Sequence, residues 1–177
     1  TKPWTLPVNV ALSVGKKVQY VKVGLPLNWA NGKEEYENVI LAKDIYEQSF
    51  DKKHPLHRAL GHAFAHDKPE GSAAVSKNVS PIQFNELLGQ KYEPLFEYGQ
   101  LTWDKGAKKV HEIVEADFVT TKDGTGVVHT AVMYGEEDFE LGKKLGFPKM
   151  HTVNLEGKFM NFLQENLRGR DVKNPET

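Results

Sequence analysis

Short runs of alternating apolar and polar residues dominate the first part of the chain. Residues 8–14 are mostly apolar, and residues 18–23 alternate valine or tyrosine with glutamine and lysine. Neighbouring side chains on a strand point to opposite faces, so both runs predict strands, and the Gly-Lys-Lys turn between them predicts that the two pair. Residues 36–41 predict another strand, followed by a helix that starts at Ala42.

The middle of the chain is less regular. Residues 56–66 have a helical pattern, and residues 69–80 are typical of a polar surface loop. Proline and glycine exclude a long helix across residues 81–96. This part of the chain therefore resembles an insertion on the surface.

The second half combines a predicted hairpin with a predicted helix. Apolar runs at 110–114 and 116–121 predict strands, and the glycine-rich turn at 122–126 is typical of a hairpin that returns through 127–132. Residues 136–145 begin with acids, end with lysines and precede a glycine, which is the polarity that the helix dipole favours. Many short strands with few helices predict an α+β fold, with a β-barrel-like core and peripheral helices.

Composition narrows the class of protein. The 177 residues predict a single domain over 1–177, with a loosely held polar tail at 168–177. The sequence has no cysteine, which excludes thiolate catalysis and cysteine-ligated metals. The net charge of −1 argues against a surface devoted to double-stranded nucleic acid. No apolar run predicts a membrane span or a secretory signal, so we expect a cytoplasmic protein without a membrane partner.

The residues with the most chemical potential lie within 123–144. A glycine-rich turn leads to a strand that carries His129 and Thr130, and three acids at 136–138 open the helix. Strand alternation places His129 on one face with a valine and an alanine, where it can line a small pocket. Spacing alone leaves a second interpretation open, in which the histidine is a packed core residue and the acids only complement the helix dipole.

A histidine cluster offers a metal-binding alternative. Four histidines lie close together in the sequence, and His62 and His66 have the spacing that places two imidazoles on one helical face. The cluster consists of His54, His57, His62 and His66. No glutamate follows His62 as a zincin motif requires, so a solvated or packed helix is favoured, and we expect neither a metal nor a cofactor.

Several motifs occur together and in a fixed order. The sequence GTGVVHTA at 124–131 is followed by GEEDFELGKK at 135–144, and it is preceded by PWTLPVN at 3–9, KYEPLF at 91–96 and ADFVTT at 116–121. Together these segments resemble the editing domain that is inserted into isoleucyl-tRNA synthetases, with 3–9 similar to its threonine-rich segment. The likeness covers residues 1–158 and is weakest at 51–80.

This resemblance implies an aminoacyl-tRNA deacylase, which hydrolyses valine wrongly esterified to isoleucine tRNA. A synthetic pocket gains only about 1–3 kcal/mol from one methylene, so a second, smaller sieve is needed. The implied partners are the 3′ end of the aminoacylated tRNA, its valine moiety and the rest of a parent synthetase, and valyl-adenylate is a further candidate substrate. Motifs for ATP are absent, so we expect an excised domain. We also expect a monomer.

The resemblance also implies roles for individual residues. Asp138 matches the acid that holds the α-ammonium group of the amino acid, and His129 matches the residue that limits pocket size. Thr130 lies beside His129, where its backbone or hydroxyl can contact the substrate. Thr5 and Asn9 match positions that place the terminal adenosine and the attacking water. Asp138, Thr5 and Thr130 are the predicted catalytic group.

Further positions of the threonine-rich segment are predicted to bind substrate or to depart from the family. Thr1 and Trp4 join the substrate-binding group, with Trp4 serving either as a packing residue or as a platform for base stacking. Lys2 stands where the family has threonine, Val132 where it has proline, and Glu137 where it has aspartate. Two alternatives stay open: a non-catalytic module that positions tRNA, and a valyl-type editing domain that clears threonine, against which Trp4 and His129 argue.

Overall fold

The computed structural model describes residues 2–27, 35–57, 60, 79–95, 110–122, 124–160, 163 and 167–173. The chain divides into two compact units. Unit 1 comprises Thr1–Ser13, Leu88–Phe118 and His129–Thr177, and unit 2 comprises Val14–Leu87 and Val119–Val128.

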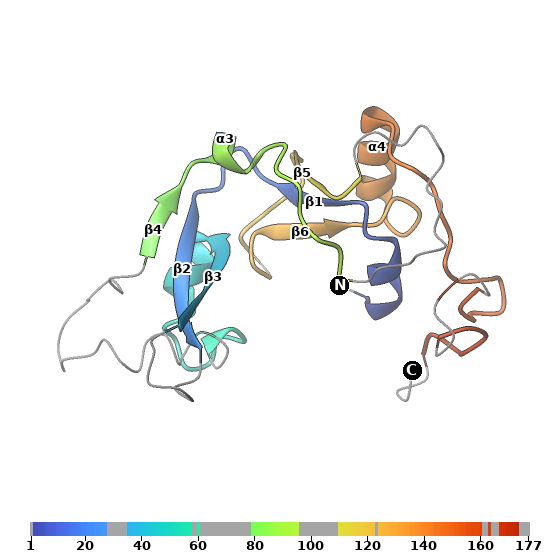
Figure 1. The fold of residues 1–177 in the computed structure, drawn as a ribbon, viewed down its shortest axis with the longest axis horizontal. Coiled ribbons are helices and arrows are strands. Elements are labelled where there is room, and N and C mark those ends of the chain that lie inside the picture. The colour runs from blue at the N-terminus through green and yellow to red at the C-terminus, as the bar shows by residue number, and fades with distance from the viewer. Residues whose placement is uncertain are drawn as a thin grey trace. The chain divides into compact units, whose positions relative to one another are not determined.

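Unit 1 is built on a sheet of three strands in the order β5-β1-β6 (Figure 1). These strands are β1 (Ala11–Val14), β5 (Glu112–Glu115) and β6 (Val127–Thr130), although the last residue of β1 and the first two of β6 are grouped with unit 2. A 3-10 helix, η1 (Pro3–Val8), precedes β1 and has a proline at its start, where the missing N–H costs nothing.

The helix α4 (Glu136–Leu145) has the bounds that the charge pattern predicts (Figure 1). It ends at Gly146, whose φ of 73° is the left-handed conformation that glycine adopts without strain. Gly142 packs against Val132 so closely that an added Cβ would lie 2.6 Å from both valine methyl groups. Close packing at this glycine therefore holds α4 against the segment that follows β6.

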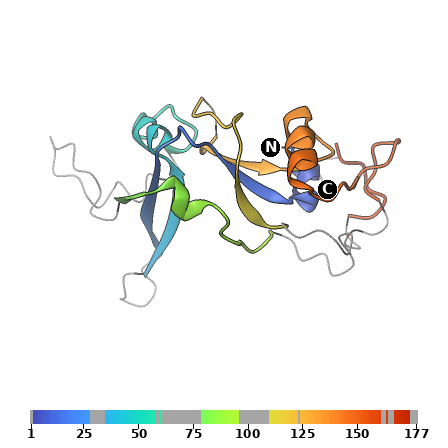
Figure 2. The same ribbon diagram turned by 90° about the horizontal axis from the view of Figure 1, so that it is seen from above.

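Unit 2 contains a second sheet of three strands, in the order β3-β2-β4 (Figure 2). The central strand β2 (Tyr20–Leu27) pairs antiparallel with β3 (Glu35–Ala42) and β4 (Val79–Ile82). Two short helices, α1 (Lys43–Gln48) and α3 (Phe84–Leu87), follow β3 and β4 respectively. The core of the unit consists of Val21, Val23, Leu41, Ala42, Ile45, Tyr46 and Leu60.

The strands that the structure describes confirm an α+β fold, but they form two separate sheets and do not close into a barrel. The predicted pairing of residues 8–14 with 18–23 is wrong, because β1 joins β5 and β6 whereas β2 joins β3 and β4. Local turn chemistry cannot reveal such pairings, since the partners lie far away in the sequence.

The predicted hairpin between residues 116–121 and 127–132 is also wrong. Residues 116–121 form turns and irregular backbone, and Val119 packs on Gly15, where an added Cβ would lie 3.3 Å from it. The strand β6 stops at Thr130 because the next N–H, that of Ala131, donates to the Asp138 carboxylate and not to a neighbouring strand. A side chain from the helix therefore ends the strand.

Part of the expected tail makes backbone contacts. The Gly169 N–H donates to the Phe159 carbonyl at 2.9 Å, and the Val172 N–H donates to the Gly157 carbonyl at 3.0 Å. Residues 174–177 lie outside the described residues, as do most of the segments predicted as a helix at 56–66 and a loop at 69–80. Within the described part of the chain, every helix is too short or too polar to cross a membrane.

Candidate functional site

The imidazole of His129 connects two segments of unit 1. Its Nε2 lies 2.9 Å from the Thr5 Oγ1 of η1, and its Nδ1 lies 2.9 Å from the Asn9 Nδ2, just before β1. The structure therefore brings together three residues that the sequence assigned to one site, although Thr5 and His129 are 124 positions apart. Both ring nitrogens have a partner.

The direction of these hydrogen bonds follows from the other contacts of the two partners. The Asn9 amide nitrogen also donates to the Ala11 carbonyl at 2.9 Å, so its second N–H points at Nδ1 of His129. The Thr5 hydroxyl donates to the Lys2 carbonyl at 2.8 Å, which leaves its oxygen to accept from Nε2. The network therefore specifies the neutral imidazole with its proton on Nε2.

Burial also favours the uncharged form of His129. It lowers the pKa of the imidazole, because the protonated ring is poorly solvated there. A protonated Nδ1 would in addition face the Asn9 N–H, donor against donor. His129 is thus held as a neutral group with both nitrogens occupied.

Local sequence explains how Thr5 and Asn9 reach this position. Pro3 is suited to the start of η1, in which the Thr5 N–H donates to the Lys2 carbonyl at 3.0 Å. The Asn9 N–H donates to the Leu6 carbonyl at 3.1 Å and closes the helix. Because Lys2 takes part through its carbonyl, its departure from threonine leaves this backbone contact intact.

The Thr130 hydroxyl does not take part in the network of Thr5, Asn9 and His129. Its side chain is fully buried, and its Oγ1 lies 2.7 Å from the Ser13 Oγ of the neighbouring strand β1. Successive residues of a strand face opposite sides, so Thr130 points away from the face that carries His129. Its backbone carbonyl accepts from the Val10 N–H at 3.0 Å and so helps to hold β6 in place.

Asp138 lies half-buried in the first turn of α4. One carboxylate oxygen accepts from the Ala131 N–H at 2.9 Å, two residues beyond His129 in the chain. Burial raises the pKa of Asp138, the bond from Ala131 opposes that effect, and the nearby Glu137 adds to it. The carboxylate is therefore incompletely compensated, which suits a group that receives a cation.

Trp4 is half-buried, and its backbone carbonyl is held through a relay. The Thr152 hydroxyl donates to that carbonyl at 3.2 Å, and the Tyr134 hydroxyl lies 2.8 Å from the same threonine oxygen. The Lys2 ammonium lies 5.7 Å from the centre of the indole, within the range of a cation–π contact. The predicted residue Thr1 lies outside the described residues.

Sequence reasoning gave no role to Tyr92, although it belongs to the matched segment 91–96. Its hydroxyl donates to the Asn9 Oδ1, on the side of the amide opposite to His129. Its ring contacts the His111 ring edge-on, with centroids 5.7 Å apart. The motif that contains Tyr92 was the signal that could have identified it.

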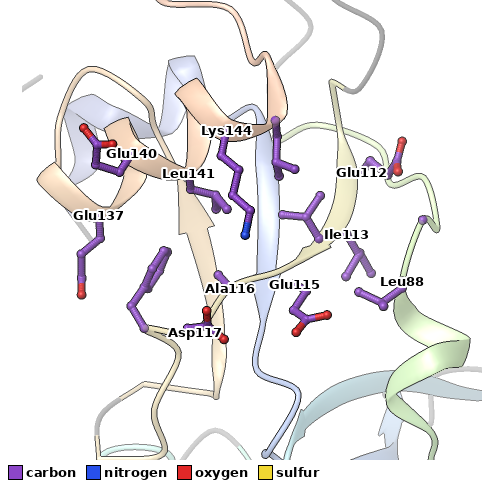
Figure 3. A pocket seen from close by; sticks show the side chains of 14 residues that line it. Leu88, Glu112, Ile113, Glu115, Ala116, Asp117, Glu137, Glu140, Leu141 and Lys144 are labelled. Atoms are coloured by element: carbon purple, nitrogen blue, oxygen red, sulfur yellow. The ribbon is translucent and has the colours of Figure 1, made fainter.

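A groove of about 970 Å³ also lies in unit 1, between α4 and β5 (Figure 3). Its walls combine apolar side chains such as Ile113 and Leu141 with the acids Glu115, Asp117 and Glu140. None of the residues that line it belongs to the predicted site. The chemistry predicted from the sequence thus lies elsewhere in the unit.

The histidine cluster is only partly described. His62 and His66 lie outside the described residues. The His57 Nδ1 donates to the Ser49 carbonyl at 2.8 Å, and the His54 Nδ1 accepts from the Leu56 N–H at 3.2 Å. Among the residues that the structure describes, no group of three or more potential ligands forms a metal site.

Comparison with known proteins places the chain. No protein-family model matches it. The chain is 36% identical over 161 residues to the isoleucine--tRNA ligase of Clostridium novyi, 39% over 161 residues to that of Clostridium acetobutylicum and 37% over 163 residues to that of Pyrococcus furiosus. These matches cover 90–91% of the chain but only 12–13% of each relative. The chain is therefore homologous to one segment of isoleucine--tRNA ligases, which confirms the resemblance found in its sequence.

Proposed function

We propose that this chain is the editing domain of an isoleucyl-tRNA synthetase, and that it hydrolyses the ester of valine misattached to isoleucine tRNA. The observation that carries the proposal is the network of Thr5, Asn9 and His129. It joins the counterpart of the threonine-rich segment to the strand that leads to Asp138. The homology to one segment of isoleucine--tRNA ligases supports the same assignment.

Asp138 binds the α-ammonium group of the misattached valine in this proposal. The carboxylate has one backbone donor and a pKa raised by burial, so an incoming ammonium supplies the charge compensation that it lacks. Binding of the cation lowers the pKa of Asp138 again and keeps the carboxylate ionised. The ion pair thereby fixes the amino acid beside β6.

His129 forms a wall of the amino-acid pocket and does not act as a base. A general base needs a free lone pair within reach of the proton that it removes, but the Nδ1 lone pair accepts from Asn9. The neutral ring is fixed from both sides, so it excludes volume with little freedom to move aside. Isoleucine, with one more methylene than valine, meets this wall.

Thr5 orients the attacking water. A hydroxyl oxygen has two acceptor positions, and His129 occupies only one of them. The water adds to the ester carbonyl carbon, the bond from that carbon to the ribose oxygen breaks, and a proton passes to the ribose oxygen. Thr130 supports this arrangement from behind by holding β6 through Ser13, rather than by touching the substrate.

The remaining expectations belong to this proposal. Trp4, Asn9 and Thr1 contact the terminal adenosine and the aminoacyl ester, and valyl-adenylate is a second substrate. The domain spans residues 1–177, works as a cytoplasmic monomer, and receives the 3′ end of tRNA presented by the rest of a parent synthetase. It needs neither metal nor other cofactor.

The test is deacylation of isoleucine tRNA charged with radiolabelled valine or isoleucine. We expect the chain to release valine and to spare isoleucine, with the same rates in EDTA. Asp138→Ala should abolish most of the valine release, and Glu140→Ala, on the same helix with an exposed side chain, is the matched control. Binding without turnover would instead indicate a tRNA-positioning module, and release of threonine from valine tRNA would indicate a valyl-type domain.

A further inference from the structure

The phenol of Tyr92 is built into the network that holds His129. Its hydroxyl donates to the Asn9 Oδ1, while the nitrogen of the same amide donates to His129 and to Ala11. Tyr92 is half-buried, and burial raises its pKa, so the phenol stays protonated and remains a donor at physiological pH. Tyr92 and Asn9 are 83 positions apart, so their contact depends on the fold of the whole unit.

The position of Tyr92 is itself fixed by the turn that precedes β5. The Tyr92 N–H donates to the His111 carbonyl at 3.1 Å, and the His111 N–H donates to the Val10 carbonyl at 2.7 Å, next to Asn9. His111 adopts a φ of 57°, a conformation that is unusual for a residue other than glycine. A hydrogen bond from the His111 ring to the Asn9 backbone partly opposes the lowering of its pKa by burial. The surroundings therefore hold His111 in an unfavourable conformation beside Asn9.

The orientation of the Asn9 amide, together with the Thr5 hydroxyl oxygen that accepts from Nε2, decides which tautomer His129 adopts. With Oδ1 toward Tyr92, an N–H faces Nδ1 of His129, and the imidazole proton must lie on Nε2. If the amide turned over, its oxygen would face Nδ1, which would then favour an Nδ1–H tautomer or the imidazolium ion. A donor at position 92 opposes that reversal.

We propose that Tyr92 is a positioning residue, which fixes the amide of Asn9 and, through it, the tautomer and orientation of the His129 ring. The contribution of Tyr92 to the exclusion of isoleucine rests on the function proposed above, whereas the effect of Tyr92 on the His129 ring does not. The Ala11 carbonyl also opposes reversal of the amide, so loss of the phenol hydroxyl releases only part of the constraint.

Two other titratable groups, Asp138 and His111, lie near His129. Asp138 accepts a hydrogen bond from the Ala131 N–H, and the His111 ring donates to the Asn9 backbone. Tyr92→Phe leaves both contacts in place, so a change in the titration of His129 reports the Asn9 amide.

The experiment compares the full chain with Tyr92→Phe by nitrogen NMR of the histidine rings. We expect a single Nε2–H tautomer for His129 in the unmodified chain. In Tyr92→Phe we expect a mixture of tautomers and a rise of the His129 pKa by up to about one unit, the equivalent of one lost hydrogen bond. Tyr20→Phe is the matched control, because it also removes a bonded phenol hydroxyl, at Gly15 and Gly126, but contacts neither Asn9 nor His129.

A second variant and a second readout keep the proposal testable. Asn9→Asp presents a carboxylate oxygen to both His129 Nδ1 and Tyr92. It should raise the His129 pKa more than Tyr92→Phe does, and it tests the role of the Asn9 amide if Tyr92→Phe folds poorly. In deacylation, Tyr92→Phe should lose several-fold in the ratio of valine to isoleucine release. A folded Tyr92→Phe variant whose His129 tautomer and pKa are unchanged, while Asn9→Asp shifts them, would overturn the proposal for Tyr92, and so would unchanged values in both variants. If NMR shows the expected shift but the chain releases no valine, only the proposed function fails.

Discussion

Replacing His129 separates a steric role from a catalytic one. His129→Ala removes the imidazole and leaves one Asn9 N–H and one acceptor position of Thr5 without a protein partner, although each keeps its other bond. Two lost hydrogen bonds at a half-buried position predict a stability loss of about 1–3 kcal/mol. The imidazole that is removed is larger than the single methylene by which isoleucine exceeds valine.

Two hypotheses for His129 then predict different rates. If the ring is a wall, its removal should raise isoleucine release by roughly 10–200-fold, the range that one methylene provides, while valine release stays within a few-fold. If the ring is a base, both rates should fall together by about 10²–10⁴-fold. Parallel deacylation of isoleucine tRNA carrying valine or isoleucine measures both rates.

His129→Gln provides the matched variant. A carboxamide presents an acceptor and a donor as the neutral Nε2–H imidazole does, so it can accept from Asn9 and donate to Thr5. It fills part of the space but has no titratable nitrogen. We expect this variant to keep most of the discrimination and the valine activity. A loss of both the discrimination against isoleucine and the release of valine in His129→Gln would refute the steric assignment.

Four further predictions follow from particular contacts. Because burial raises the pKa of Asp138, kcat/KM for valine release should fall on acidification at a higher pH than an exposed aspartate would give, which a pH–rate profile measures. Asp138→Asn should lose about 2–4 kcal/mol of transition-state binding. It should unfold no more easily than the unmodified chain, because an amide can still accept from the Ala131 N–H without the cost of burying charge. A clear loss of stability in urea denaturation would contradict this prediction. The pKa of Asp138 is raised in the folded state, so the protonated carboxyl contributes stability at low pH. That stability is lost as the pH rises through the folded-state pKa. The stability advantage of Asp138→Asn over the unmodified chain should therefore grow with pH. Gly142→Ala should lower stability by about 1–3 kcal/mol despite the better helix propensity of alanine, and Val132→Ala should partly rescue it, as a double-mutant cycle in urea would show.

Local signals were enough to predict some elements. The bounds of α4 follow from acids at its start, lysines at its end and Gly146 beyond, all within one stretch of chain. The pairing of β1 was not predictable in this way, because β5 and β6 come about a hundred residues later and turn chemistry says nothing about them. The hairpin punctuation at residues 122–126 was misleading for the same reason.

The candidate site shows the same division. Resemblance selected Thr5, Asn9 and His129, but only the fold shows that the first two both bond to the imidazole, which carries its proton on Nε2. Strand alternation by itself implies that Thr130 faces away from His129. Tyr92 was visible only as part of a motif, because its contact with Asn9 depends on a turn around His111 that no local pattern reveals.

The discontinuous composition of unit 1 has a consequence for folding during synthesis. Residues 1–13 leave the ribosome long before residues 88–118, and the strand that carries His129 follows later still. Thr5 and Asn9 must therefore wait without their partner until more than a hundred further residues have been made, and long-range closure of this kind is slow. A nascent chain stalled before residue 129 contains η1 and β1 but lacks the His129 imidazole, to which Thr5 and Asn9 are hydrogen-bonded in the folded unit. Protection of the Thr5 and Asn9 backbone amides against hydrogen exchange should thus develop only after β6 is complete.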